Sequence, residues 1–295
     1  VPRHRSGQPR ASVCGVKDNL FKMYRIKPQE EDFIYLFCVT NRLPKLKETE
    51  GLAANVYFIS HYGLYAVVSK VSVDEFSEEN LKKNIANLEW LKAKAIIHEK
   101  VIEAIMKNSD IIPFKFGTLF NNAENLITML KKHIGEFKNT LKYLKDKEEW
   151  GIKIYCDTIQ LWENLMREDK EFLNLDREIG SASAGKAYIL KKKKEELVNM
   201  AVSKNLNNYG QDSFEKLKRH SIKSRINKLL PKEVTERKDD MILNSVFLIE
   251  KNVTADFKSA VEGIKAGYSG KGLFLDCTGP WPPYNFCEAA AYGVT

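Results

Sequence analysis

The stretch ILNSVFLIEK, residues 242–251, runs apolar along most of its length, which is typical of a strand buried in a sheet. The preceding PKEVTER (231–237) alternates apolar and polar residues and predicts a second strand paired with the first. Beyond them, apolar residues at three- and four-residue steps predict a helix over 254–267, and KGLFLDC (271–277) predicts a last strand. The end of the chain therefore predicts strand, strand, helix, strand.

The next strand toward the N-terminus is WGIKIYCD (150–157). Between it and PKEVTER, the spacing of apolar residues predicts helices over about 158–178, 186–206 and 212–230, with a break at NNYGQD. With this helical excursion (158–230) set aside, the order is βαββαβ, the order of a ferredoxin-like sandwich.

The first half of the chain predicts a related α+β layer. Its strand patterns are FIYLFCVT (33–40), NVYFIS (55–60), LYAVVSKV (64–71) and IIPFKFGTLF (111–120). Two amphipathic helices are expected, one long helix over about 77–108 and another over 122–145. Together these elements predict an antiparallel sheet that is covered on one face by two helices.

The 295 residues therefore predict two α+β domains with ferredoxin-like character, in which antiparallel sheets are covered by helices. Residues 1–31 are expected to be a disordered leader or a tag remnant. Residues 32–148 form the first predicted domain and 149–295 the second. The second domain carries a long helical insertion over about 158–230 and a proline- and aromatic-rich tail at 278–287.

Net charge is +8, and one segment accounts for it: between Lys186 and Lys238 there are 15 Lys and Arg against 6 Asp and Glu. The basic helices over 186–230 make nucleic acid an alternative partner, through phosphate contacts. However, acidic residues directly follow the bases in KKKKEEL and aromatic residues are sparse. This pattern favours a solvated helical hairpin.

The five cysteines are an odd number without CxxC spacing. Cys38, Cys156 and Cys277 lie inside apolar strand patterns, where cysteine acts as a small hydrophobic residue. We therefore expect a reducing cytoplasm. No run of about 18 apolar residues occurs, so no membrane segment is expected.

GSASAGKA (180–187) differs by one residue from a phosphate-binding P-loop, because Ala187 stands where a Ser or Thr would hold magnesium. The segment also follows a polar helix, whereas a P-loop follows a buried strand. An ATP-binding enzyme is therefore a weaker alternative than a flexible connector between helices.

Motifs for catalysis or metal binding are missing from the sequence. His98-Glu99 has no second histidine at the spacing of a HExxH zinc site, and GxSxG does not occur. His98 falls on the apolar face of its predicted helix, which favours a hydrogen-bonded core histidine. We predict no catalytic, metal-binding or cofactor-binding residue, and no small-molecule substrate.

The tail TGPWPPYNF raises two alternatives, a structural latch and a partner site. Pro280, Pro282 and Pro283 fix the backbone φ and reduce the entropy lost on docking. Trp281 and Tyr284 can then bury their rings against the fold if their N–H and O–H find partners. These properties favour the latch.

Five blocks of sequence, spread along the chain, carry a family resemblance. They are YGLYAVVSKVSVDEF (62–76), NLEWLKAKAIIHEKVIEAIMKNSDIIPFKFGTLF (87–120), KEEWGIKIYCD (147–157), SAGKAYILKKK (183–193) and DCTGPWPPYNF (276–286). In this order they resemble the GvpF/GvpL family of gas vesicle accessory proteins.

The resemblance implies a cytoplasmic prokaryotic protein that associates with gas vesicles, the hollow protein shells that give cells buoyancy. It implies a minor shell or assembly component, chaperone-like, that binds the hydrophobic shell protein GvpA and other accessory proteins. The implied fold is two α+β domains with a helical extension. The family implies neither catalytic residues nor a cofactor.

Two groups of residues are candidates for binding these partners. The aromatic residues of the N-terminal sheet are the candidate shell-protein contacts: Phe33, Tyr35, Phe37, Tyr57, Tyr65, Phe114 and Phe116. The lysine run is the candidate contact for acidic partners: Lys191, Lys192, Lys193 and Lys194.

Overall fold

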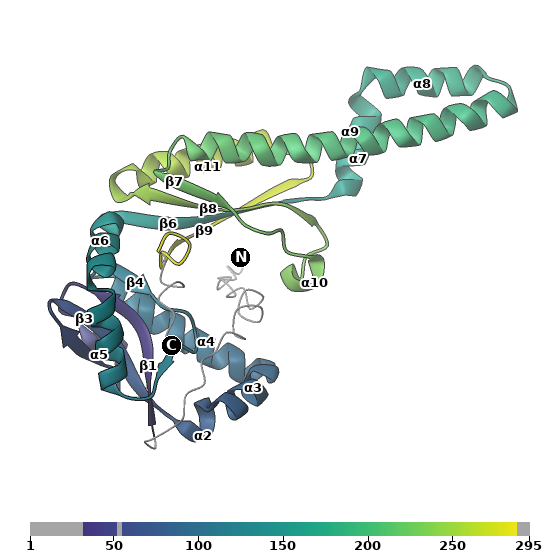
Figure 1. The fold of residues 1–295 in the computed structure, drawn as a ribbon. Coiled ribbons are helices and arrows are strands. Elements are labelled where there is room, and N and C mark those ends of the chain that lie inside the picture. Colours follow the sequence, from purple (N-terminus) through teal and green to yellow (C-terminus); the bar gives the residue numbers. More distant parts are fainter. Residues whose placement is uncertain (1–31, 52–54, 288–295) are drawn as a thin grey trace, which may run out of the picture. The chain divides into compact units, whose positions relative to one another are not determined.

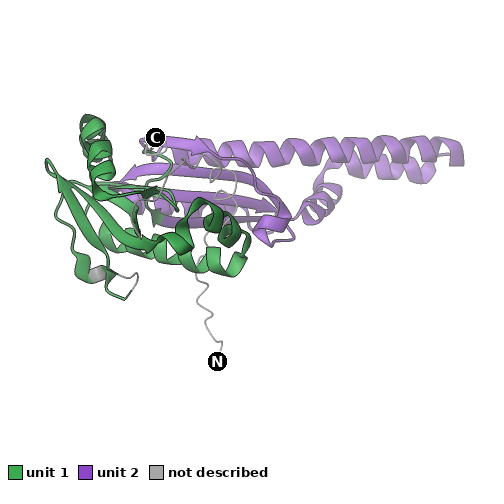
Figure 2. Ribbon diagram, turned by 60° about the horizontal axis from the view of Figure 1, so that its bottom comes forward, with its two compact units in different colours: residues 1–149, 280–295 green, residues 150–279 purple. Residues whose placement is uncertain are grey.

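The structure, a computed structural model, describes residues 32–51 and 55–287, so the expectation for residues 1–31 lies outside the described residues. The chain divides into two compact units (Figure 2). Of the described residues, unit 1 contains 32–51, 55–149 and 280–287, and unit 2 contains Trp150–Gly279. The sequence placed the whole of 149–295 in one domain, whereas the described residues 280–287 group with unit 1.

Unit 1 is built on an antiparallel sheet with the order β2-β3-β1-β4, in which β5 also pairs with β1. Its strands are β1 (Asp32–Thr40), β2 (Tyr57–His61), β3 (Leu64–Ser72), β4 (Ile111–Pro113) and β5 (Leu119–Phe120). The single strand predicted over 111–120 is wrong, because the chain leaves the sheet after Pro113, which has no N–H to donate. It turns at Gly117, whose φ of 81° suits glycine, and then rejoins β1.

The helices of unit 1 are shorter than the sequence predicted. They are α2 (Val73–Phe76), α3 (Glu78–Ala86), α4 (Leu88–Met106), α5 (Ala123–Lys132) and α6 (Ile134–Leu144), with a 3₁₀ turn at η1 (Leu46–Thr49). The predicted helix 77–108 breaks at Asn87, whose side chain accepts hydrogen bonds from the backbone N–H of Glu89 and Trp90. An asparagine that caps in this way ends one helix and starts the next. The predicted helix 122–145 breaks at His133, whose backbone N–H donates to the carbonyl oxygen of Met129 at the end of α5.

Unit 2 has a four-stranded sheet with the order β7-β8-β6-β9. Its strands are β6 (Lys147–Cys156), β7 (Lys223–Ile226), β8 (Asp240–Glu250) and β9 (Leu273–Trp281). Numbered along the chain, the sheet order is second, third, first, fourth, which is the order of a ferredoxin-like βαββαβ sheet. The ferredoxin-like prediction for the second half is confirmed. Unit 1 has the same order, with the 3₁₀ turn in place of the first crossover helix.

The helices of unit 2 are α7 (Thr158–Glu168), α8 (Lys170–Ser181), α9 (Ala184–Lys218), α10 (Lys232–Thr235) and α11 (Thr254–Gly267), and η2 (Lys251–Val253) is a 3₁₀ turn. The strand predicted at 231–237 is wrong, because α10 lies there. The true partner of β8 is β7, inside the predicted helix 212–230. β7 is an edge strand whose residues are mostly exposed, so it lacks the apolar pattern of a buried strand.

The break predicted at NNYGQD is also wrong, because α9 runs through it for 35 residues. Gly210 is buried there, and a Cβ at this position would lie 3.1 Å from the carbonyl oxygen of Ile242 on β8. The glycine therefore lets the helix approach the strand closely instead of ending the helix.

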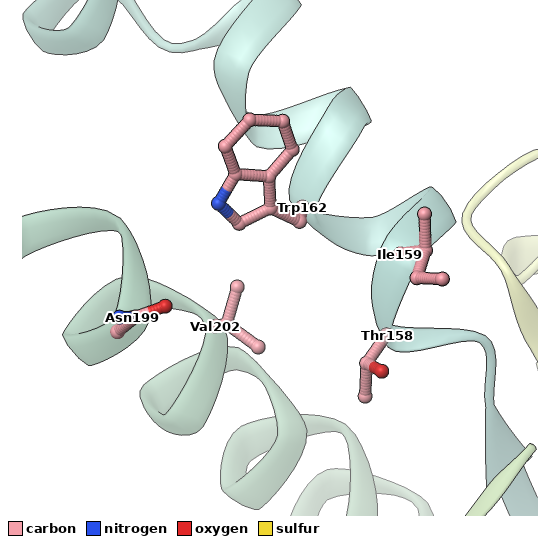
Figure 3. A pocket seen from close by; sticks show the side chains of 5 residues that line it. All are labelled: Thr158, Ile159, Trp162, Asn199 and Val202. Carbon is pink, nitrogen blue, oxygen red and sulfur yellow. The ribbon is translucent and has the colours of Figure 1, made fainter. Parts of the chain in front are cut away.

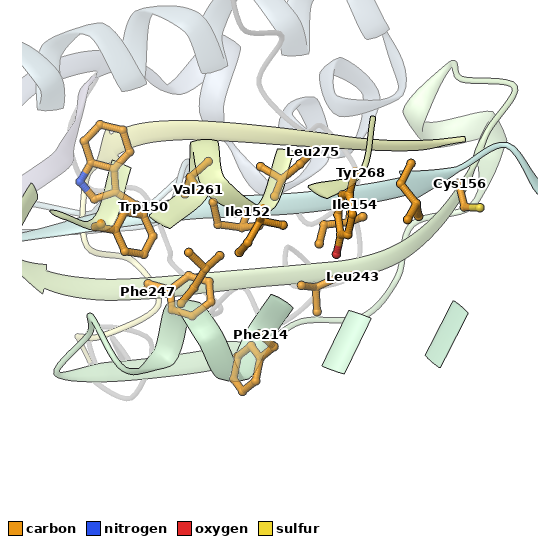
Figure 4. Packing of buried hydrophobic residues seen from close by; sticks show 14 of the residues in the cluster. Trp150, Ile152, Ile154, Cys156, Phe214, Leu243, Phe247, Val261, Tyr268 and Leu275 are labelled. Atoms are coloured by element: carbon orange, nitrogen blue, oxygen red, sulfur yellow. The ribbon is translucent and has the colours of Figure 1, made fainter. Parts of the chain in front are cut away.

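The core of unit 2 lies between the sheet and helices α9 and α11 (Figures 1 and 4). Phe247 of β8 is fully buried and packs between Phe214 of α9 and Phe257 of α11, with ring centroids 5.6 Å away in both cases. Beyond the sheet, α9 continues outward with α8 alongside it (Figure 1). We call α8 together with α9 up to Met200 the arm.

Candidate functional site

Unit 1 contains a buried polar cluster that links the proline-rich segment after β9 to strand β1 and helix α4. We define the polar cluster as Tyr35, His98, Glu99, Gly117 and Tyr284. Tyr35 comes from β1, His98 and Glu99 come from α4, and Tyr284 follows β9. His98 is 2% exposed on the apolar face of α4 and lies against aromatic rings, as the sequence predicted for a core histidine.

The hydrogen bonds of the cluster have one consistent direction. The N–H of Gly117 donates to Tyr35 Oη over 3.1 Å, so the Tyr35 hydroxyl is left to donate to His98 Nδ1 over 2.9 Å. His98 must then carry its proton on Nε2, which lies 3.1 Å from the carbonyl oxygen of Phe114 and 3.2 Å from Tyr284 Oη. Tyr284 in turn donates to Glu99 Oε1 over 3.0 Å. The cluster therefore uses a neutral His98.

Burial shifts the pKa values of the titratable groups in the cluster. It lowers the pKa of His98 to about 4, so the ring is neutral at pH 7. Burial raises the pKa of Glu99 to about 7, with a smaller contribution from Glu103, while the hydrogen bond from Tyr284 acts in the opposite direction. The pKa of Tyr284 is raised well above its usual value by burial and by Glu99.

A second carboxylate holds the next residue of the same segment. Glu149 accepts from the backbone N–H of Asn285 over 3.0 Å and from Asn285 Nδ2 over 2.6 Å. Its pKa is also raised to about 7, mainly by burial. Two consecutive residues of the segment therefore each bond a carboxylate that titrates near neutral pH.

Replacing Glu99 by glutamine should make the protein more stable at pH 8 relative to the wild type than it is at pH 4.5. The Glu99 pKa is about 7 in the folded chain and about 4.5 as the ordinary value, so the folded state holds the proton more tightly. Its contribution to the free energy of unfolding is therefore complete below pH 4.5 and is lost as the pH rises through 7. The introduced glutamine keeps an acceptor for Tyr284 and does not titrate. We expect a relative gain on the order of 2 kcal/mol, measured by urea unfolding across this pH range.

The matched control is Glu89→Gln, at an exposed position on the same helix. His98 and Glu149 titrate in both the wild type and the variants, so their contributions cancel in the difference. A wild-type-to-variant difference that stays constant across the same pH range would contradict the role assigned to Glu99.

The chemistry available to the cluster is structural. Its donors and acceptors are used to bond one another and the backbone.

Burial raises the pKa of the Cys38, Cys156 and Cys277 thiols, which disfavours the nucleophilic thiolate. Within residues 32–51 and 55–287, no group of three or more His, Cys, Asp or Glu could hold a metal ion.

The aromatic residues singled out in the sequence fall into two sets. Phe33, Tyr35, Phe37 and Phe114 are each 3% exposed and belong to the interior of unit 1. This burial has a simple cause, since β1 lies between β3 and β4 in the sheet and its continuous apolar run is covered on both faces. The remaining three, Tyr57, Tyr65 and Phe116, are partly exposed.

The four lysines of the run 191–194 also differ in their exposure. Lys191, Lys192 and Lys193 are exposed, whereas Lys194 is 8% exposed and bonds Asp176 of α8. Lys194 is therefore part of the seam between the two helices, which corrects its assignment as a partner contact. In the P-loop-like segment, Lys186 pairs with Glu178 at 3.1 Å, and the segment joins two helices, as a connector does.

The latch residues lie at the end of the described chain. Pro280 is exposed and Trp281 is partly exposed, whereas Pro282 and Pro283 are buried. Tyr284 and Asn285 make the hydrogen bonds described above.

Sequence reasoning missed an open groove of about 280 Å³ at the base of the arm (Figure 3). Its lining residues come from two helices, Thr158, Ile159 and Trp162 from α7 and Asn199 and Val202 from α9. Ile159 is 71% and Trp162 41% exposed. The one signal in the sequence was this apolar pair three residues apart on a helix that starts after Asp157.

Comparison with known proteins gives a consistent answer. The family model described as "Gas vesicle synthesis protein GvpL/GvpF" matches residues 33–288. "Gas vesicle protein L" of Streptomyces sp. (strain CB03234) is 22% identical over 80% of this chain and 84% of its own length. "Gas vesicle protein F1" of Halobacterium salinarum is 22% identical over 82% of this chain and 86% of its own length.

Solved structures resemble the fold. The crystal structure of GvpF from Anabaena sp. PCC7120 aligns with a TM-score of 0.63 at 22% identity, over 86% of this chain and 98% of that chain. GvpF from Microcystis aeruginosa aligns with a TM-score of 0.57 at 19% identity, over 87% of this chain and 99% of that chain. Among the described residues, no helix has the length and apolar character needed to cross a membrane.

Proposed function

The chain belongs to the gas vesicle synthesis protein GvpL/GvpF family and therefore has an accessory role in gas vesicles, and we propose that it carries out this role by binding the hydrophobic shell protein GvpA. Family membership over residues 33–288 is the observation that carries the proposal. Binding of other accessory proteins belongs to the same proposal. Its site of action is the cytoplasm, at the growing vesicle.

The physical reason for such a partner lies in the shell protein. A protein that will line a gas space must expose apolar surface, and before assembly that surface promotes aggregation. A partner can cover it by adding a strand to a sheet edge. On this view the protein acts by binding and shielding, without catalysis or a cofactor.

The outer edge of the unit 1 sheet supports this mode of binding. β2 stands at one end of the strand order, and Tyr57 on it and Tyr65 on β3 are partly exposed. Phe58 and Tyr65 pack edge to face across the two strands, with ring centroids 5.4 Å apart. The proposed contact is therefore narrower than the seven aromatic residues of the sequence prediction. It lies along the β2 edge, where Tyr57 faces one side of the sheet and Tyr65, opposite Ser60, faces the other.

The test is vesicle formation in cells that express GvpA with and without this chain. We expect omission of the chain to reduce the yield of floating vesicles by about tenfold or more. The chain should also be recovered with GvpA, either on washed vesicles or in a complex captured before shell growth. Unchanged vesicle yield without the chain, together with no recovery of a GvpA complex, would reject the proposal.

A further inference from the structure

The arm carries an exposed helical surface that its own partner helix leaves uncovered. α8 packs on one side of α9, where Val198 is buried and Lys194 bonds Asp176. Successive residues of an α-helix are rotated by about 100°, which places Ile189, Lys192 and Met200 on the side opposite this seam. We call Tyr188, Ile189, Lys192, Lys193 and Met200 the outer face of the arm.

Large apolar side chains on this face are exposed to an unusual degree. Ile189 is 67% exposed, Met200 68% and Tyr188 62%. Ile189 and Met200 are eleven residues apart, which is about three turns and about 16 Å along one side of the helix. Apolar side chains in such a row resemble the anchors by which helices recognise one another.

Positive charge accompanies these anchors. Lys191, Lys192 and Lys193 are exposed, and Lys192 Nζ lies 5.3 Å from the centre of the Tyr188 ring. In the part of the arm that the structure describes, the α9 lysines that form ion pairs are Lys186, with Glu178, and Lys194, with Asp176. Among its described residues, the outer face therefore carries two unpaired positive charges, Lys192 and Lys193, against one exposed negative charge, Glu196, next to exposed apolar groups.

The groove at the base of the arm lies on a neighbouring row of α9, because Asn199 and Met200 are successive residues and so lie about 100° apart around the helix. Asn199 is seven residues, or about two turns, beyond Lys192, so both lie on one row of α9. Asn199 lines the groove with Trp162 and Ile159 (Figure 3). The groove is a recess that one bulky apolar side chain of a bound helix can enter.

We propose that the outer face of the arm binds an amphipathic helix of a partner protein, one that carries acidic residues beside two apolar anchors about eleven residues apart. The lysines select for acidic side chains, and Ile189 and Met200 select for the anchors. A second copy of the arm fits less well, since it would bring like charges together. A nucleic acid backbone offers no apolar anchor to pack on Ile189 and Met200.

The probe is a fluorescein-labelled helical peptide of Glu, Ala and Leu, with two leucines eleven residues apart and glutamates flanking them. Its binding to the full chain is followed by fluorescence anisotropy. A second peptide with lysine in place of every glutamate has the same apolar row and the opposite charge. We expect the acidic peptide to bind at least about tenfold more tightly, and its affinity to fall as salt is added.

Two double variants and one matched control locate the site. Lys192→Glu with Lys193→Glu and, separately, Ile189→Ser with Met200→Ser should each weaken acidic-peptide binding by about tenfold. The control is Lys138→Glu with Lys142→Glu, which reverses two exposed charges on α6 and should change the affinity by less than about twofold. All substituted side chains are exposed, and unchanged thermal unfolding verifies that the variants fold.

Equal affinity for the two peptides, or peptide binding that both arm variants retain, would overturn the proposal. So would wild-type self-association in sedimentation that the arm variants lose, because the occupant would then be a second copy. Tighter arm-dependent binding to anionic vesicles or to DNA than to the acidic peptide would likewise reject it. The inference goes beyond GvpA binding and rests on unit 2 alone, so the peptide titration and the vesicle test can fail independently.

Discussion

Replacing Tyr284 by alanine is expected to lower the free energy of unfolding by about 3 kcal/mol. The ring packs against the core of unit 1, and its hydroxyl bonds both Glu99 and His98. Alanine removes the partly buried ring and leaves Glu99 without its donor, so two unfavourable effects add. Urea unfolding followed by fluorescence measures the loss, and hydrogen exchange of β1 assigns it to unit 1.

Tyr284→Phe separates the two effects, because it keeps the ring and removes only the hydroxyl. We expect a loss of about 1–2 kcal/mol from this variant. The matched control is Tyr188→Ala, which removes a ring that is 62% exposed on the arm and should change stability by less than about 0.5 kcal/mol. If Tyr284→Ala were no more destabilising than this control, the segment after β9 would not act as a latch.

Phe257→Ala should destabilise unit 2 by about 3–5 kcal/mol, the largest loss that we expect from a single substitution. Phe257 is fully buried on α11, where its ring centroid lies 5.6 Å from that of Phe247 and 6.5 Å from that of Trp150. Truncation leaves a cavity in a core that strands and helices enclose, as Figure 4 shows for Phe247 and Trp150. The midpoint and slope of urea unfolding measure the effect.

Phe274→Ala provides the comparison within the same unit. Its ring is 43% exposed on β9, and the guanidinium of Arg237 lies 5.8 Å from the ring centre. We expect a loss of about 1 kcal/mol or less. Similar losses from Phe257→Ala and Phe274→Ala would show that the sheet and α11 do not form the closed core described here.

The prediction of unit 2 from sequence succeeded where burial controls the pattern. β8 has one long apolar run and α11 has a clear helical period, so both elements were found with nearly correct bounds. It failed at β7, because that strand lies at the sheet edge and its side chains face solvent. Backbone hydrogen bonds to β8 hold β7 in place, and such bonds cannot be predicted from the polarity of the side chains.

The sequence was sufficient to predict single residues of the candidate site, but not the contacts between distant residues. The apolar face of α4 was sufficient to predict a buried His98 with hydrogen-bond partners, and the structure confirms it. Its contact with Tyr284 joins residues 186 positions apart, which no local pattern encodes. The aromatic residues of β1 led to a wrong prediction of exposure. A strand that is buried on both faces of a sheet has the same apolar composition as an exposed surface that binds a partner.

The return of the chain to unit 1 has a consequence for the order of synthesis. All strands of the unit 1 sheet are complete by Phe120, yet the residues that bond Glu99 and Glu149 are Tyr284 and Asn285. At about 5–20 residues per second, the ribosome reaches them on the order of ten seconds or more after His98 has been made. A prematurely terminated chain would keep the sheet and lack its closing segment. Unit 1 is therefore closed only after the ribosome has made unit 2, although its sheet is complete before unit 2 begins.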